Sequence, residues 1–146
     1  MMKTEARDNG PVLVDAIYNG IVATQEMVAE IGENMVECAN TLRIGRSEAV
    51  FTDLSACFDD LASLIDFVGS LKAGLDELSG GGGWNSKLLC WEKTLAIFEE
   101  MHASFEREDW ITLADMIEYE LLPLLQDGCL AFSEIQKGME KEYQAA

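Results

Sequence analysis

Basic residues and histidine are scarce in this chain. It has 10 lysines and arginines against 27 aspartates and glutamates, and a single histidine, which gives a formal net charge of −17. So acidic a surface repels nucleic-acid phosphates and anionic lipid headgroups, which excludes the usual nucleic-acid and membrane-surface binding classes. It favours a basic or neutral partner. We therefore expect a protein partner or a homo-oligomer, with no nucleic acid and no membrane.

Long apolar runs are also missing. Residues 1–10 are polar, and no stretch reaches the roughly 18 apolar residues that a membrane-spanning helix needs. The sequence therefore predicts neither a signal peptide nor a membrane span, and a cytoplasmic location follows as the expectation. The cysteines are widely spaced and include no CxxC pair, which argues against structural zinc and favours buried free thiols at Cys38, Cys57, Cys90 and Cys129.

The one histidine lies in a Glu-x-x-His step formed by Glu99 and His102. Such a step is half of the ferritin-like di-iron signature, but no second histidine completes it, so we expect no di-metal centre and no cofactor. His102 falls on the apolar seam, where a buried imidazole needs hydrogen-bond partners. This position predicts a structural polar pair with a carboxylate such as Glu99, Asp115 or Glu118. The alternative is a His102 that is partly solvated near the end of the bundle.

An apolar rhythm of alternating three- and four-residue steps runs through four separate stretches. They span about 11–43, 47–79, 85–105 and 110–143, and a flexible tail is expected over residues 1–10. Only 2 prolines are present and 49% of the residues are hydrophobic, so a packed helical core is expected. The sequence predicts one all-α domain, residues 1–146, folded as an antiparallel up-down-up-down four-helix bundle with a heptad-like core.

Local signals mark the ends of these helices. Pro11 suits a first turn, and Ser47 and Asp109 suit N-caps. The glycines at 80–83 predict a loop, because each would weaken a helix by about 1 kcal/mol relative to alanine. Pro123 lies inside the last stretch and removes one hydrogen-bond donor, which predicts a kink.

Carboxylates that could hold a divalent cation occur only in fragments. Asp115 and Glu118 are three residues apart and share a rim of one helix, as do Glu30 and Glu33. The all-α nucleotide pyrophosphohydrolases use E-E-x-x-E and E-x-x-D steps on facing helices, and this chain offers Glu30-x-x-Glu33 and the step at 106–109. Mg²⁺ needs converging oxygens, so a Mg/Mn-dependent enzyme of that kind stands as an alternative.

The segment 109–125, DWITLADMIEYELLPLL, carries a resemblance. It resembles a recurrent D-[WY]-x-x-L-A-D-[LM]-[IL]-E-Y-E-[LI]-x-P-x-L segment of small uncharacterised bacterial helical proteins. The resemblance implies a bacterial helical bundle without a known activity. It makes Asp115, Glu118, Tyr119 and Glu120 the candidate binding surface. On a helical wheel Asp115 and Tyr119 point away from the core, so a partner or a second subunit would cover them.

No catalytic constellation is complete, which favours a non-enzymatic protein-binding or adaptor bundle. By shape analogy, flagellar and secretion export chaperones are small acidic helical bundles that bind an amphipathic segment in a groove. The Mg/Mn-dependent enzyme and a self-associating structural protein remain as alternatives.

Overall fold

The protein is an all-α four-helix bundle. The structure is a computed structural model that describes residues 2–45, 47–79 and 85–141. The first two helices are α1 (Met2–Ile44) and α2 (Glu48–Ser79). A short 3₁₀ turn, η1 (Asn85–Leu88), leads into α3 (Leu89–Glu106). The last rod is continuous and consists of α4 (Trp110–Met116), the π-helical turn η2 (Ile117–Leu121) and α5 (Leu122–Met139).

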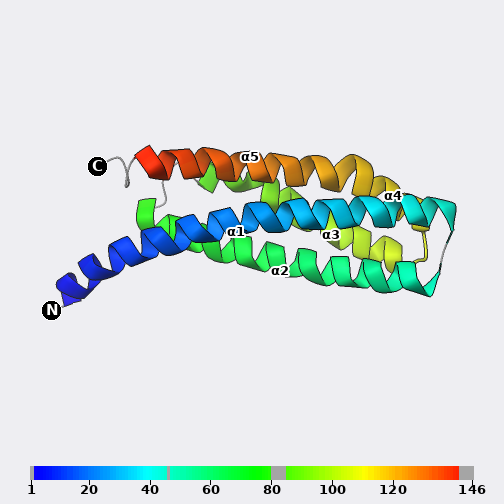
Figure 1. The fold of residues 1–146 in the computed structure, drawn as a ribbon, viewed down its shortest axis with the longest axis horizontal. Coiled ribbons are helices and arrows are strands. Elements are labelled where there is room, and N and C mark those ends of the chain that lie inside the picture. Colours follow the sequence, from blue (N-terminus) through cyan, green and yellow to red (C-terminus); the bar gives the residue numbers. More distant parts are fainter. Residues whose placement is uncertain (1, 46, 80–84, 142–146) are drawn as a thin grey trace.

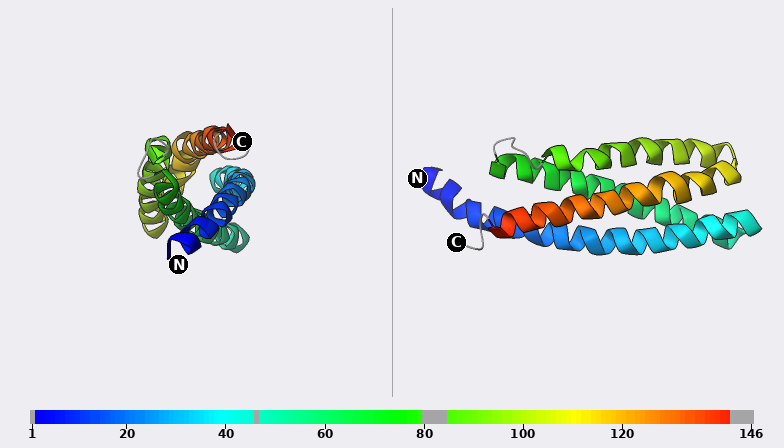
Figure 2. Two further views of the ribbon diagram at one scale, coloured as in Figure 1. Left: turned by 90° about the vertical axis from the view of Figure 1, so that its left-hand side faces the viewer. Right: turned by 90° about the horizontal axis from the view of Figure 1, so that it is seen from above.

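Successive helices run in opposite directions, which confirms the expected up-down-up-down architecture (Figure 1). Seen end-on, the four rods surround one interior, with α1 next to α2 on one side and next to α4 and α5 on the other (Figure 2). No helix in the described part of the chain is both long and apolar enough to cross a membrane.

The first helix begins earlier than the sequence predicted. The sequence predicted a flexible tail over residues 1–10, but residues 2–10 are helical. The first helix, α1, therefore has 43 residues. Its N-terminal end extends past the neighbouring helices (Figure 1). Pro11 does not start this helix. Proline's fixed φ is itself helical, so the helix continues through Pro11 although one hydrogen bond is lost there, and the preceding segment contains strong helix formers, Lys3, Glu5, Ala6 and Arg7.

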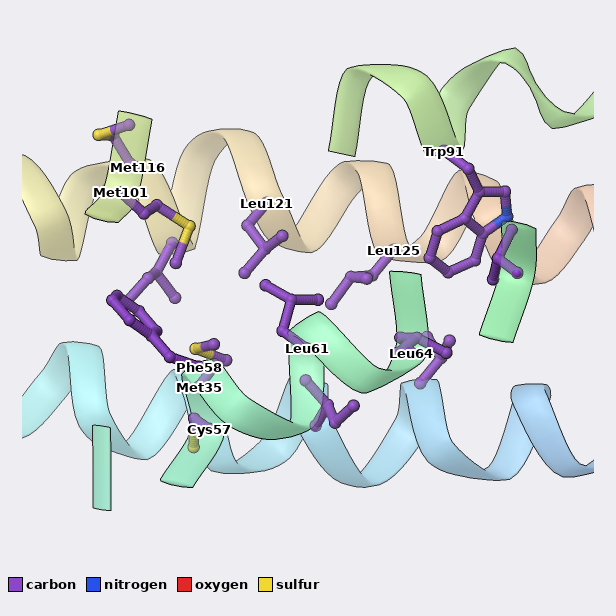
Figure 3. Close-up of a cluster of buried hydrophobic side chains, with 14 of the residues drawn as sticks. Met35, Cys57, Phe58, Leu61, Leu64, Trp91, Met101, Met116, Leu121 and Leu125 are labelled. Atoms are coloured by element: carbon purple, nitrogen blue, oxygen red, sulfur yellow. The ribbon is translucent and has the colours of Figure 1, made fainter. Parts of the chain in front are cut away.

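The predicted apolar seams of α1 and α2 form the interior. Thr24, which fills an apolar slot in α1, is fully buried and donates its hydroxyl to the carbonyl oxygen of Gly20 at 2.8 Å. The apolar face of α2 is buried from Val50 to Leu75, and Figure 3 shows four of its residues, Cys57, Phe58, Leu61 and Leu64. The core residues of these two helices are Ile17, Ile21, Val28, Ile31, Met35, Cys38, Ala39, Leu42, Val50, Leu54, Cys57, Phe58, Leu61, Leu64, Val68, Leu71 and Leu75.

The buried face of α3 is rotated relative to the predicted one. The three–four spacing of Trp91, Leu95, Phe98 and His102 predicts Leu95 and His102 on the seam, yet both are exposed. Thr94 and Ser104 are buried instead, with exposed fractions of 0% and 1%. Their hydroxyls are satisfied locally, because Thr94 donates to the carbonyl oxygen of Cys90 at 2.9 Å and Ser104 donates to Sδ of Met116 at 3.6 Å. Small polar residues with internal partners can enter a helix interface at little cost.

The predicted caps are present at the two short connections. The backbone N–H of Val50 donates to Oγ of Ser47 at 3.4 Å, and that of Thr112 donates to Oδ1 of Asp109 at 3.3 Å. The predicted loop at 80–83 and the predicted end of the last helix at about residue 143 lie outside the described residues.

Glu108, between α3 and α4, has a left-handed backbone with φ of 58°. Glycine is the usual residue in this helix-ending position, because a side chain costs about 1 kcal/mol there. We expect Glu108→Gly to raise the free energy of unfolding by about 1 kcal/mol in urea titrations. Glu100→Gly is the matched control. This exposed position lies inside α3, so the change to glycine should lower the free energy of unfolding by about 1 kcal/mol. Equal destabilisation by both changes would contradict a left-handed backbone at Glu108.

The irregularity at Pro123 takes the form of a widened turn. The backbone N–H of Leu122 donates to the carbonyl oxygen of Ile117, five residues earlier, and η2 is π-helical. Proline has no N–H to offer the carbonyl of Tyr119 and its ring crowds that oxygen. A π turn relieves this crowding by letting the preceding carbonyls shift their partners.

Candidate functional site

Two of the four residues predicted to form the binding surface, Asp115 and Glu118, form ion pairs within the bundle. Nη2 of Arg43, at the end of α1, lies 2.9 Å from Oδ1 of Asp115 and 3.1 Å from Oε2 of Glu118. The hydrogen bond to Asp115 raises the pKa of Arg43. These two carboxylates therefore fasten the last rod to α1. Tyr119 and Glu120 are exposed and remain available to a partner.

Tyr119 shares a carboxylate with this ion pair. A hydrogen bond to Glu118, together with the nearby negative charge, raises the pKa of Tyr119 above its ordinary value of 10.0. Its hydroxyl should thus stay protonated to higher pH than a free tyrosine. The difference in ultraviolet absorbance between wild type and Tyr119→Phe, followed through alkaline pH, isolates this titration. Glu118→Gln should return the midpoint towards 10.0, and an unchanged midpoint would show that Glu118 is not the cause.

The two carboxylate pairs considered for a divalent cation are not brought together. Asp115 and Glu118 lie beside Arg43, whereas Glu33 is ten residues earlier on α1, about 15 Å away along the helix. Among the described residues, no three histidines, cysteines or acids converge as metal ligands. Asp109 caps α4, and this leaves Glu106 without a partner for an E-x-x-D site.

The predicted polar pair of His102 with Glu99 is wrong. The side chain of His102 is 53% exposed, and its Nδ1 lies 4.0 Å from Oε1 of Glu106, one turn further along α3. Neither Asp115 nor Glu118 reaches it, because Arg43 holds both. The ring instead covers Phe58, with centroids 5.4 Å apart. The partly solvated alternative is the one that the structure supports.

A polar groove of about 540 Å³ lies between α1 and α2. Its floor contains the buried free thiols Cys38 and Cys57, and its walls carry Glu37, Asp53 and Asp60. A thiol–thiol hydrogen bond, burial and the surrounding carboxylates raise the pKa of Cys57. Cys57 therefore stays protonated and is a poor nucleophile, whereas the hydrogen bond with Cys57 lowers the pKa of Cys38.

A second groove of about 540 Å³ lies on the other side of α1, against α5, and is predominantly apolar. We call it the α1/α5 groove. Leu130 and Val36 stand at its edges and are 64% and 39% exposed. The residues that line it are Val28, Ala29, Gly32, Glu33 and Val36 of α1 and Leu122, Leu125, Gln126, Cys129 and Leu130 of the last rod.

Small residues on α1 create this groove. A Cβ added at Gly32 would meet only Cδ2 of Leu122, at 3.8 Å, an ordinary van der Waals contact. Ala29, one turn earlier, also leaves space opposite α5. Apolar periodicity does not reveal this surface, whose signal in the sequence is the pair of small residues, Ala29 and Gly32, next to the apolar seam.

Polar contacts fasten the two helices on both sides of the groove. Arg43 and Asp115 hold one end, and towards the other end Nε2 of Gln25 donates to Oγ of Ser133 at 3.1 Å. Further along, the hydroxyl of Tyr18 donates to Oε1 of Glu140 at 2.7 Å. These contacts fix the position of the last rod along α1, so the recess between the two is preformed.

A row of acids runs along α1 between the two grooves. Glu26, Glu30, Glu33 and Glu37, here called the glutamate row, are spaced by four, three and four residues, so they share one helical face. All four are exposed; Glu33 lines the α1/α5 groove, whereas Glu37 lines the polar groove between α1 and α2. Ion pairs found in the described part of the chain involve other acids, Asp115, Glu118, Glu92, Glu134 and Glu106.

Comparison with known proteins gives a family and no activity. Neither the curated proteins nor the solved structures include a match to the chain. A family model described as a domain of unknown function, DUF8042, matches residues 21–127. This range covers most of α1, all of α2 and α3, and the first part of the last rod. The chain belongs to the DUF8042 family.

Proposed function

We propose that the protein is a non-enzymatic binding module that holds a helical segment of a partner protein in the α1/α5 groove. The observation that carries this proposal is an apolar recess of about 540 Å³, with Leu130 64% exposed at its rim. Contiguous exposed apolar surface on a protein with so many charges marks an interaction site. The groove residues of α1 run from 28 to 36, about 12 Å of helix, which matches roughly two turns of a ligand helix.

The shape and chemistry of the groove favour a helix over other ligands. Two antiparallel helices form its walls, and a third helix laid between them would place apolar residues three and four apart into the recess. The polar lining side chains, Glu33 and Gln126, stand among apolar ones. Burial raises the pKa of the Cys129 thiol, which keeps it protonated near neutral pH and unreactive. The side chains that line the groove can therefore contact a ligand but do not catalyse a reaction on it.

A neutral amphipathic peptide tests the groove. The probe is a helix of about 18 residues with leucines three and four apart and glutamine and alanine elsewhere. Gly32→Leu should weaken its binding about tenfold or more by calorimetry, because the new side chain fills the recess. The helix itself should survive, since leucine is a better helix former than glycine.

The matched control is Gly69→Leu, the same change on α2, where a Cβ meets nothing within 4 Å. It should leave the affinity for the peptide unchanged. Equal affinity of wild type and Gly32→Leu for the peptide, or equal losses in both variants, would refute the α1/α5 groove as the binding site.

A further inference from the structure

Two free thiols meet where α1 packs against α2. Cys38 lies nine residues before Ser47 in the connection, and Cys57 lies ten residues after it. Two antiparallel helices place residues that are equally far from their connection at the same level. A hydrogen bond between the two thiols changes the pKa of both. The two sulfurs are therefore in direct contact across the helix interface.

The surroundings of this pair differ from those of an ordinary core thiol. The two residues are only 6% and 4% exposed, yet both line the polar groove of about 540 Å³ between α1 and α2. A free cysteine that serves as a small hydrophobe lies among apolar side chains. Asn34, Thr41 and Asp53 share this groove instead. A small polar reagent that enters the groove therefore reaches both cysteines.

We infer that Cys38 and Cys57 form an oxidation site, at which hydrogen peroxide converts the two thiols into a disulfide that joins α1 to α2. The pair faces the opposite side of α1 from the α1/α5 groove, so its oxidation does not depend on a ligand there. Glu37, Asp53 and Asp60 line the same polar groove and repel anionic oxidants such as oxidised glutathione. Hydrogen peroxide is uncharged and only slightly larger than water, so the groove admits it.

The hydrogen bond between the thiols assigns the order of attack. It lowers the pKa of Cys38 and raises that of Cys57, so Cys38 ionises first. The Cys38 thiolate attacks one oxygen of hydrogen peroxide and the O–O bond breaks. A sulfenic acid forms, and the leaving hydroxide takes up a proton to become water. The Cys57 thiol then attacks the sulfenic sulfur, the S–O bond breaks, and the disulfide forms as a second water leaves. The two thiols lose two electrons, which the peroxide gains.

The first step also prepares the second. The pKa of Cys57 is raised by the hydrogen bond with Cys38, by burial and by the negative charge of the Cys38 thiolate. That charge is absent from the sulfenic acid, so Cys57 ionises more readily than in the reduced pair. Because the two sulfurs are already in contact, the disulfide forms without unfolding of either helix.

Treatment of the folded protein with a few-fold molar excess of hydrogen peroxide tests this site. The remaining thiols are then alkylated in denaturant, and trypsin cuts after Arg43 and Arg46, which places the two cysteines on different peptides. We expect one joined pair of peptides that contains Cys38 and Cys57, and a chain mass lower by two hydrogens. Dithiothreitol should restore both thiols.

Two variants test the order of attack. Cys57→Ser should stop at a sulfenic acid on Cys38, which dimedone traps, because serine keeps a hydrogen-bond donor beside that thiol. Cys38→Ser should leave the Cys57 thiol intact over the same time. Serine is close to cysteine in size, and circular dichroism establishes that each variant is folded. Equal trapping of sulfenic acid in the two variants would overturn Cys38 as the attacking thiol.

Cys90 and Cys129 are the internal controls. They lie on α3 and α5, and burial raises the pKa of both thiols. Both should lose their thiols about tenfold more slowly than the pair. The disulfide closes a loop of about 20 residues, so the oxidised protein should have a Tm about 5 °C above that of the reduced protein.

Three results would overturn the inference. The first is oxidation of all four cysteines at the same rate. The second is a set of disulfides that join different chains. The third is a lower Tm after oxidation, since the disulfide would then form only by distorting the bundle.

Discussion

Replacing Phe132 by alanine is expected to lower the free energy of unfolding by about 3–5 kcal/mol. Phe132 lies on α5, is fully buried, and packs against Trp91 with ring centroids 5.7 Å apart. Truncation removes the transfer free energy of the ring and leaves a cavity between α3 and α5. The surrounding helices cannot close it fully, because their contacts along the rest of the bundle hold them in place.

The measurement is a urea or guanidinium titration followed by circular dichroism. Ile111→Ala is the control, because this residue is 51% exposed on α4 and its loss should change the free energy by about 0.5 kcal/mol or less. Equal losses in the two variants would contradict the placement of Phe132 in the interior.

Gly128→Ala is expected to destabilise the protein by about 1–3 kcal/mol, although alanine is the better helix former. A Cβ at this position would lie 2.5 Å from Cζ2 and 2.7 Å from Cε2 of Trp91. The indole is itself buried, and its Nε1 has no hydrogen-bond partner among the described residues. Figure 3 shows this ring pointing from α3 towards α5. Glycine is therefore the residue that lets the indole approach the helix backbone.

The matched control for this prediction is Gly69→Ala. Its Cβ would meet nothing within 4 Å, in the middle of α2. Here only helix propensity changes, so the free energy of unfolding should rise by about 1 kcal/mol. If both alanine variants were stabilised, Trp91 would not lie against Gly128.

Much of the fold was predictable from the spacing of apolar residues. The seams of α1 and α2 are regular and strongly hydrophobic, and they are buried as predicted. The seam of α3 was misplaced because Leu95 and His102 fit the rhythm, whereas Thr94 and Ser104 reach the interior. Apolar periodicity cannot detect a buried hydroxyl whose partner lies in its own helix, as for Thr94, or in a neighbouring helix, as for Ser104.

The position of the irregular backbone in the last rod was predicted, but its form was not. Pro123 marked the correct part of the last rod, yet whether a helix kinks or forms a π turn depends on its packing neighbours. The start of α1 was not predictable from Pro11, because proline is compatible with a helical φ and helix formers precede it in the chain.

The candidate site was only partly predictable. Asp115 and Glu118 were identified as partner-facing acids, but Arg43 binds both from a different helix. The groove depends on Gly32 and on the register between α1 and α5, and a single sequence read helix by helix carries no register.

Mapping amide chemical shifts of the ¹⁵N-labelled protein while the neutral amphipathic peptide is added tests the central claim most directly. We expect the largest shifts along the α1/α5 groove, at Gly32, Val36, Gln126 and Leu130, with α2 and α3 nearly unchanged. Shifts spread over all acidic faces, or concentrated between α1 and α2, would contradict a binding groove between α1 and α5.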